Sequence, residues 1–134
     1  DELRQNGARV NYTYSFENQE KLNDAIAESK VILIISFLDN HSPVDYFRLC
    51  YLLSNKAFVI HEQAPFEGKG EEAEYCSKVV FCEYTNLVAK CLFYLKKTEK
   101  ELINLGYGAF EEFKGSNRLE DRFPAEKLKQ CLLE

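Results

Sequence analysis

Three short apolar runs alternate along the chain with longer segments whose apolar residues recur at helical spacing. The runs span residues 31–37, 57–61 and 79–82. Uninterrupted runs of this length are typical of strands buried on both faces, as in parallel sheets. A shorter alternation of apolar and polar residues at 10–14 predicts one more strand.

The segments that follow these runs predict helices, because their apolar residues lie three and four positions apart. One helix is expected at 17–29, and a second is expected to open at Ser42-Pro43 and stop near Asn55. Two more follow the third run. Each begins at a residue whose side chain can accept a hydrogen bond from the first N–H groups of a helix. These expected caps are Asn18, Ser42, Thr85 and Thr98.

The helix after Thr98 contains two glycines, Gly106 and Gly108, which are expected to weaken its middle. Aromatic residues in the last two long helices are spaced for packing against other elements, so we expect them in the core rather than on a binding surface. They are Phe93, Tyr94, Tyr107, Phe110 and Phe113.

Strands that alternate with helices imply βαβ units and a parallel sheet. The sequence therefore predicts an α/β fold, specifically a Rossmann-like three-layer sandwich with a mostly parallel sheet and helices on both faces. A chain of 134 residues corresponds to a single domain, residues 1–134. We interpret the chain as a fragment, with 116–134 as a C-terminal tail that carries a short helix.

Composition narrows the function classes. Hydrophobic residues make up 46% of the chain and charged residues 29%, as in ordinary globular domains. The net charge of −5 disfavours a nucleic-acid partner, which needs a basic face. No apolar run approaches the ~20 residues of a membrane span. The first ten residues lack the apolar core of a signal peptide, so we expect a cytoplasmic protein.

The cysteines favour reduced thiols. The chain has five, an odd number, and no Cys-x-x-Cys pair occurs. A disulfide framework is therefore disfavoured. Cys50, Cys82 and Cys91 lie in apolar periodic segments and are expected to be buried. No residues have the spacing of a zinc site, so no metal is expected.

A polar loop, residues 38–43, lies where the first long strand ends and a helix begins. In open α/β sheets, ligands bind beyond the carboxyl ends of the strands. The helix N-terminus offers free N–H groups for an anion, and Arg48 could add a bidentate phosphate contact. The alternative is that Ser42 merely caps the helix and Arg48 is an ordinary surface arginine.

From Ser29 to about Lys114 the sequence resembles the C-terminal half of GT-B glycosyltransferases, in the group 1 and CgeB-like branch. The similarity lies in the order and spacing of several segments. They are VILIISF, a helix with a central arginine (DYFRLCYLLSNK), a strand that ends in an acid (FVIHE), the strand and helix VVFCEYTNLVAKCLFYLKK, and the final helix ELINLGYGAFEEF. This resemblance implies a domain that binds a nucleotide-sugar donor.

The resemblance also implies site residues. The donor-binding set is Tyr14, Ser15, Asp39, Asn40, Ser42, Pro43, Val44, Asp45, Arg48, Glu62 and Glu83. Tyr14 and Ser15 would lie near the base, and the segment from Ser42 to Arg48 near the phosphates. Glu83 ends the last strand and could accept a ribose or sugar hydroxyl, or could be a plain strand-end acid. His41 is a candidate catalytic base, as is His61, because histidine titrates near neutral pH.

The implied function is transfer of a sugar, hexosyl or pentosyl, from a nucleotide diphosphate donor. The donor is a substrate, and no cofactor is expected. Catalysis would require an N-terminal acceptor-binding domain of the same enzyme, so the fragment alone is expected to be inactive. Many retaining GT-B enzymes carry two glutamates separated by seven residues, but Phe47 and Leu53 stand at that spacing after Asp39 and Asp45. That departure favours the alternative, a non-catalytic Rossmann-like interaction module.

Overall fold

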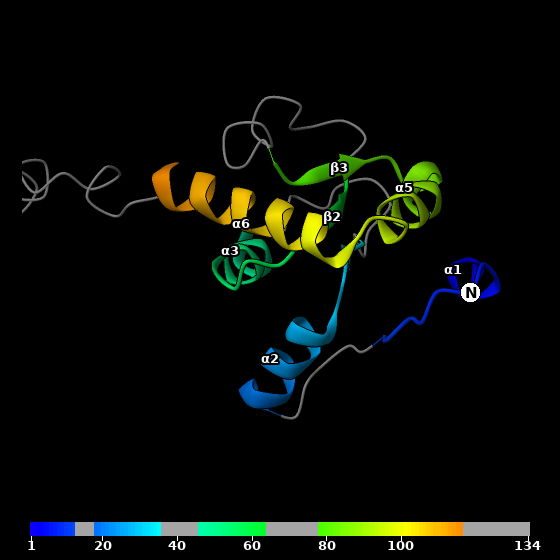
Figure 1. Ribbon diagram of the computed structural model, residues 1–134, viewed down its shortest axis with the longest axis horizontal. Helices are drawn as coiled ribbons and strands as arrows, with labels where there is room; N and C mark the ends of the chain where they lie inside the picture. Colours follow the sequence, from blue (N-terminus) through cyan, green and yellow to red (C-terminus); the bar gives the residue numbers. More distant parts are fainter. Residues whose placement is uncertain (13–17, 36–45, 64–77, 117–134) are drawn as a thin grey trace, which may run out of the picture.

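The computed structural model describes residues 1–12, 18–35, 46–63 and 78–116. This part of the chain contains short strands with helices before, between and after them (Figure 1). The elements in order are α1 (Glu2–Gln5), α2 (Gln19–Glu28), β1 (Ile32–Ile34), α3 (Tyr46–Ser54), β2 (Val59–Glu62), β3 (Val80–Cys82), the 3-10 turn η1 (Tyr84–Asn86), α5 (Leu87–Leu95) and α6 (Glu99–Ser116).

The three strands form one parallel sheet in the order β1-β2-β3. The register pairs Ile34 with His61 on one side of β2, and Glu62 with Cys82 on the other. The prediction that the runs 31–37 and 57–61 are adjacent parallel strands is therefore confirmed for the described residues of these runs. The third run, 79–82, supplies β3 as expected.

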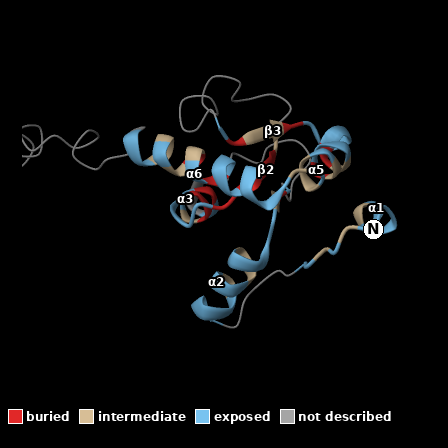
Figure 2. Cartoon of the chain, in the orientation of Figure 1, coloured by how far each residue is buried: buried red, intermediate tan, exposed pale blue. Residues whose placement is uncertain are grey.

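Alternate residues of each strand point to opposite faces of the sheet, and both faces are buried. The α3-side cluster consists of Ile34, Leu49, Leu52, Leu53, Ala57, Val59, Val79 and Ala109. The α5-side cluster consists of Phe58, Ile60, Cys82, Leu87, Cys91 and Leu102. Figure 2 shows the buried positions gathered on the strands and on the inner sides of α3 and α5. The structure is thus a mixed α/β fold with helices on both faces of a parallel sheet.

Helix α6 belongs to both clusters. Leu102, near its start, packs in the α5-side cluster, whereas Ala109, two turns later, packs in the α3-side cluster. Between them, Gly106 is buried against the backbone of Lys56 and Ala57, which lead into β2. Gly108 lies beside Lys78, which precedes β3. Helix α6 therefore crosses the amino edge of the sheet, and the opposite, carboxyl edge is where a ligand site is expected.

The two glycines do not interrupt α6, which is continuous from Glu99 to Ser116. The expected weakening rested on helix propensity alone. In the fold, the missing side chain of Gly106 lets the helix approach the strand-leading backbone, and this close packing acts against a propensity cost of about 1 kcal/mol.

Helix α3 ends in a Schellman motif. The N–H of Lys56 donates to Leu53 (2.9 Å) and the N–H of Ala57 donates to Leu52 (3.1 Å). Lys56 takes a positive φ of 59°, a conformation that favours glycine. Its Nζ lies 4.6 Å from the ring centre of Tyr107 on α6 and donates to the Tyr107 hydroxyl (3.1 Å). Helix α3 thus ends at Ser54, directly before Asn55, which the sequence predicts as its stop.

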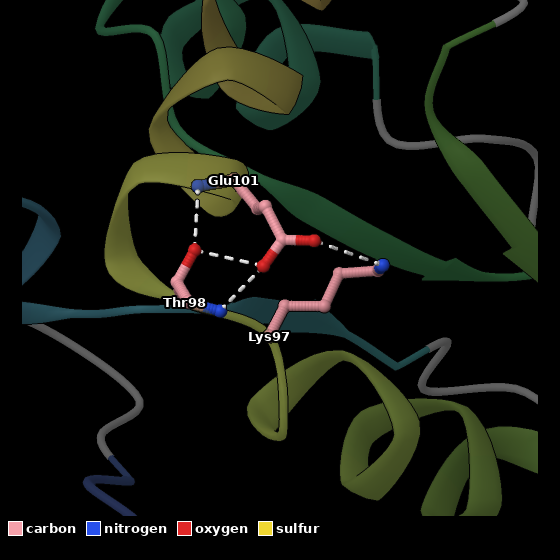
Figure 3. A network of polar contacts seen from close by, with 3 residues as sticks. All are labelled: Lys97, Thr98 and Glu101. Carbon is pink, nitrogen blue, oxygen red and sulfur yellow. Dashed lines mark hydrogen bonds and ion pairs between the residues drawn. The ribbon is translucent and has the colours of Figure 1, made fainter.

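Two of the expected caps are confirmed. The side chain of Asn18 accepts from the Lys21 N–H (2.9 Å) at the start of α2. At the start of α6, Thr98 and Glu101 form a capping box (Figure 3). Thr98 donates through its N–H (2.8 Å) and its hydroxyl (2.7 Å) to Glu101, whose own N–H donates back to the Thr98 hydroxyl (3.3 Å). The expected cap Ser42 lies outside the described residues.

The prediction that Thr85 caps a helix is wrong. Thr85 lies inside the 3-10 turn η1, and α5 begins only at Leu87. The N–H of Asn86 donates to the Glu83 carbonyl (2.9 Å), so the turn itself satisfies a donor that a cap would otherwise serve.

Two further predictions need correction. Residues 10–12, the described part of the expected strand 10–14, do not form a strand; the carbonyl of Val10 instead accepts from the Arg4 side chain (3.1 Å).

Cys50 is exposed, because the buried stripe of α3 consists of Leu49, Leu52 and Leu53 and Cys50 lies off it. Cys82 and Cys91 are buried free thiols, as expected. None of the described helices is long and apolar enough to cross a membrane.

Candidate functional site

Most of the predicted site falls outside the described residues. This holds for Tyr14, Ser15, Asp39, Asn40, His41, Ser42, Pro43, Val44 and Asp45. The structure does describe Arg48, Glu62 and Glu83, together with the alternative base His61. They can therefore be compared with the carboxyl edge of the sheet, where strands β2 and β3 end.

Arg48 lies in the first turn of the described part of α3, and its side chain is exposed. A helix that joins two parallel strands runs back along the sheet, so its beginning lies toward the carboxyl edge. Arg48 is thus near the correct edge. Since α3 packs in the α3-side cluster, however, Arg48 lies on the opposite face of the sheet from α5.

His61 is part of the sheet interior rather than a surface base. Only 2% of it is exposed, and its ring lies 5.3 Å from that of Phe81, its register partner on β3. Its Nδ1 donates to the main-chain oxygen of Glu62 (2.6 Å). Its position two residues after Val59 directs it to the α3-side cluster. A base must reach its substrate, and this ring is enclosed by the protein.

A hollow of about 510 Å³ lies at the carboxyl edge, on the α5 side of the sheet. It is bounded by the ends of β2 and β3, by η1 and by the first turns of α5. The lining residues are Gln63, Cys82, Glu83, Asn86, Ala89, Lys90 and Phe93. The N–H of Gln63 donates to the Cys82 carbonyl (2.8 Å), which holds the chain after β2 against β3.

The charges around this hollow are mixed. Burial raises the pKa of the Cys82 thiol; the ammonium of Lys90 acts against that rise, and the carboxylate of Glu62 adds to it. Both charges therefore lie close enough to Cys82 to act on it. Glu62 is also the register partner of Cys82, and Glu83 follows Cys82 directly. Burial likewise raises the pKa of Cys91, deeper under α5.

The hollow brings Glu83 together with groups that the sequence analysis did not select, namely Gln63, Asn86, Lys90 and Phe93. Phe93 was expected in the core, but 58% of it is exposed. Tyr107, also expected in the core, is 47% exposed. The helical period of α5 did contain a signal for these lining residues. Leu87 and Cys91 mark the buried stripe of α5, which leaves positions 86, 89, 90 and 93 together on another face.

These groups suit a polar ligand with an aromatic or flat part. Amides, a carboxylate and an ammonium line the hollow, and the ring of Phe93 offers an apolar surface. Within the described ranges, no group of three or more His, Cys, Asp or Glu side chains is placed to hold a metal ion. Comparisons with protein-family models, with curated proteins and with solved structures found no match to this chain.

Proposed function

We propose that this chain is the nucleotide-sugar donor-binding domain of a GT-B glycosyltransferase, with a Rossmann-like fold. The observation that carries the proposal is the hollow at the carboxyl edge of a parallel sheet, which is lined by Glu83 and adjoins Glu62. In open α/β folds this edge is where ligands bind, whatever the chemistry of the particular protein.

The physical support is the direction in which the strands and helices run at this edge. Parallel strands end at one edge, and the helix that follows a strand begins at that edge, so the positive end of its dipole faces the ligand. Here β3 ends at Cys82, and α5 begins five residues later at Leu87. An anionic donor such as a nucleoside diphosphate sugar is the kind of ligand this arrangement favours.

In this proposal Glu62 and Glu83 accept hydrogen bonds from ribose or sugar hydroxyls, and Arg48 approaches the phosphates from the α3 side. The donor is a substrate, and neutralising the leaving diphosphate with cationic side chains requires no cofactor. Transfer of the sugar occurs only when an acceptor-binding domain of the same enzyme supplies the second half of the site. We propose a cytoplasmic location for the enzyme.

A second candidate is a non-catalytic interaction module. It is favoured by apolar side chains exposed on α6, where 51% of Ile103 and 47% of Tyr107 are accessible. These two residues lie four positions apart and therefore on one face of the helix. An exposed apolar stripe is a common feature of surfaces that meet another protein.

Donor binding separates the two candidates. Calorimetry and ligand-observed NMR with UDP-, GDP- and dTDP-sugars should detect binding of at least one donor to the chain. Sugar transfer is not expected from the chain alone. If the folded chain binds none of the donors at millimolar concentration, the donor-binding function is wrong and the interaction module is favoured.

A further inference from the structure

The lining of the hollow includes a cation and an exposed aromatic ring on one helix face. Lys90 and Phe93 lie three positions apart on α5, and both line the hollow. Side chains at this spacing are neighbours, with their Cβ atoms about 5–6 Å apart. Neither residue belongs to the donor-binding set implied by the resemblance, so the pair calls for its own explanation.

The ring of Phe93 is held in place but open to a ligand. Tyr94 meets it edge-on, with ring centres 5.1 Å apart, and the Nζ of Lys97 lies over one face of the ring, 5.4 Å from its centre. Lys97 is in turn 3.6 Å from Glu101, whose capping box fixes the start of α6 (Figure 3). In spite of these neighbours 58% of Phe93 is exposed. A fixed, exposed ring is a surface on which a nucleobase can stack.

Lys90 lies one turn nearer the sheet edge than Phe93. Side chains of a helix lean toward its N-terminus, so we expect the ammonium of Lys90 on the side of Asn86, which also lines the hollow. A phosphate there would meet an ammonium and a helix dipole of the same sign. The carboxylates of Glu62 and Glu83 lie on the strand side, where hydroxyl groups rather than phosphates suit them.

We infer that α5 is the nucleotide-recognition helix of this site, with the base stacked on Phe93 and the diphosphate held by Lys90 near the positive dipole end of the helix. The inference rests on the proposed function and assigns its ligand an orientation. The base lies against Phe93, the diphosphate beside Lys90 with the ribose between them, and the transferred sugar beside Glu83 and Asn86. Arg48, on the other face of the sheet, does not contact the base in this arrangement.

The test is a two-by-two comparison of variants and ligands by NMR titration and calorimetry. Base stacking is worth about 1–3 kcal/mol, so Phe93→Ala should weaken a nucleoside and its diphosphate alike, by about 5- to 150-fold. Lys90→Ala should weaken the diphosphate about tenfold, more at low salt, and leave the nucleoside unchanged. In the wild-type chain, amide shifts should concentrate at Gln63, Cys82 and Asn86.

Matched controls are available on neighbouring turns. Tyr84→Ala removes a ring that is 67% exposed but does not line the hollow, and Lys96→Ala removes an exposed lysine at the end of α5. Both should bind like the wild-type chain, and thermal melting should show all four variants folded. If the wild-type chain binds donors but Phe93→Ala and Lys90→Ala bind equally well, this inference is overturned while the proposed function stands. If the wild-type chain binds no nucleotide, both are overturned.

Discussion

The main-chain oxygen of Lys56 occupies the space that a β-carbon on Gly106 would need. The added carbon would also lie 3.1 Å from the carbonyl carbon of Lys56 and 3.3 Å from that of Ala57. These atoms are backbone, and they belong to the segment that leads into the central strand. Helix α6 can cross the amino edge of the sheet at this distance only because position 106 has no side chain.

Replacing Gly106 with alanine should destabilise the fold. The methyl group would force either α6 or the start of β2 to move, and overpacking of this kind costs about 1–3 kcal/mol. Urea denaturation gives the free energy of unfolding directly. The matched control is Gly108→Ala, where the nearest atom is the flexible Lys78 Nζ at 3.4 Å. That variant should gain up to about 1 kcal/mol of helix propensity. Equal effects of the two substitutions would mean that the close approach does not limit the fold.

The positive φ of Lys56 should lower the stability of the fold. Replacement by glycine and by alanine both remove the ammonium that contacts Tyr107, but only glycine relieves the left-handed backbone. The glycine variant should therefore be more stable than the alanine variant by about 1 kcal/mol. Chemical denaturation of the two variants side by side measures this difference. An alanine variant as stable as the glycine variant would show that Lys56 leaves this conformation without loss.

Glu101 should make α6 sensitive to acid. Hydrogen bonds from the hydroxyl and then the N–H of Thr98, with the charge of Lys97 adding to them, hold the pKa of this carboxyl below its usual range. The unfolded chain therefore binds this proton at a higher pH than the folded chain does. The stabilisation is present above the unfolded pKa of about 4.3 and is lost as the pH falls through the lower, folded value.

Thermal melting between pH 3 and pH 7 tests whether the stability falls with pH in this way. Glu101→Ala should lower the melting temperature at pH 7 and flatten its decline toward pH 3. Glu101→Gln can still accept the Thr98 hydrogen bonds, so it should keep more of the stability at pH 7 but lose the pH dependence. A glutamine variant that retains the full pH dependence would assign that dependence to other carboxyl groups.

Arg48 should matter for diphosphates and little for folding. If it approaches the donor phosphates, Arg48→Ala should weaken diphosphate binding by about 1.5–3 kcal/mol, the range for hydrogen bonds to charged groups. The nucleoside should be affected far less. Because Arg48 is exposed, the free energy of unfolding should change by only about 0.5 kcal/mol. Unchanged diphosphate affinity would exclude the phosphate role, and an unfolded variant would identify Arg48 as a structural residue.

Much of the fold could be predicted from the sequence, because the apolar runs that form β1, β2 and β3 need burial on both faces. Capping was harder to predict from residue type alone. Thr98 is followed by Glu101 three residues later and forms a capping box, whereas Thr85 has Val88 at that position and lies in a 3-10 turn. The second half of the motif therefore distinguished a true cap from a threonine near a helix.

The candidate site was less predictable, because helical spacing identifies a helix but not what covers each of its faces. Phe93 and Cys50 both lie in apolar segments, and both are exposed in the fold. The hollow depends on how η1 and α5 follow β3, and on the hydrogen bond between Gln63 and Cys82, which joins the residue after β2 to β3. Contacts between segments distant in the chain leave no periodic signal.

The crossing of α6 from one face of the sheet to the other has a consequence for cooperativity. Leu102 and Ala109 anchor this single helix in two separate hydrophobic clusters. If α6 detaches from one cluster, its contacts with the other cluster are therefore disturbed as well. The two faces of the sheet therefore behave as one unfolding unit. Amide protons of β2 on both sides should exchange with solvent only through global opening, at the same free energy, whereas those of the 3-10 turn should exchange through local fraying.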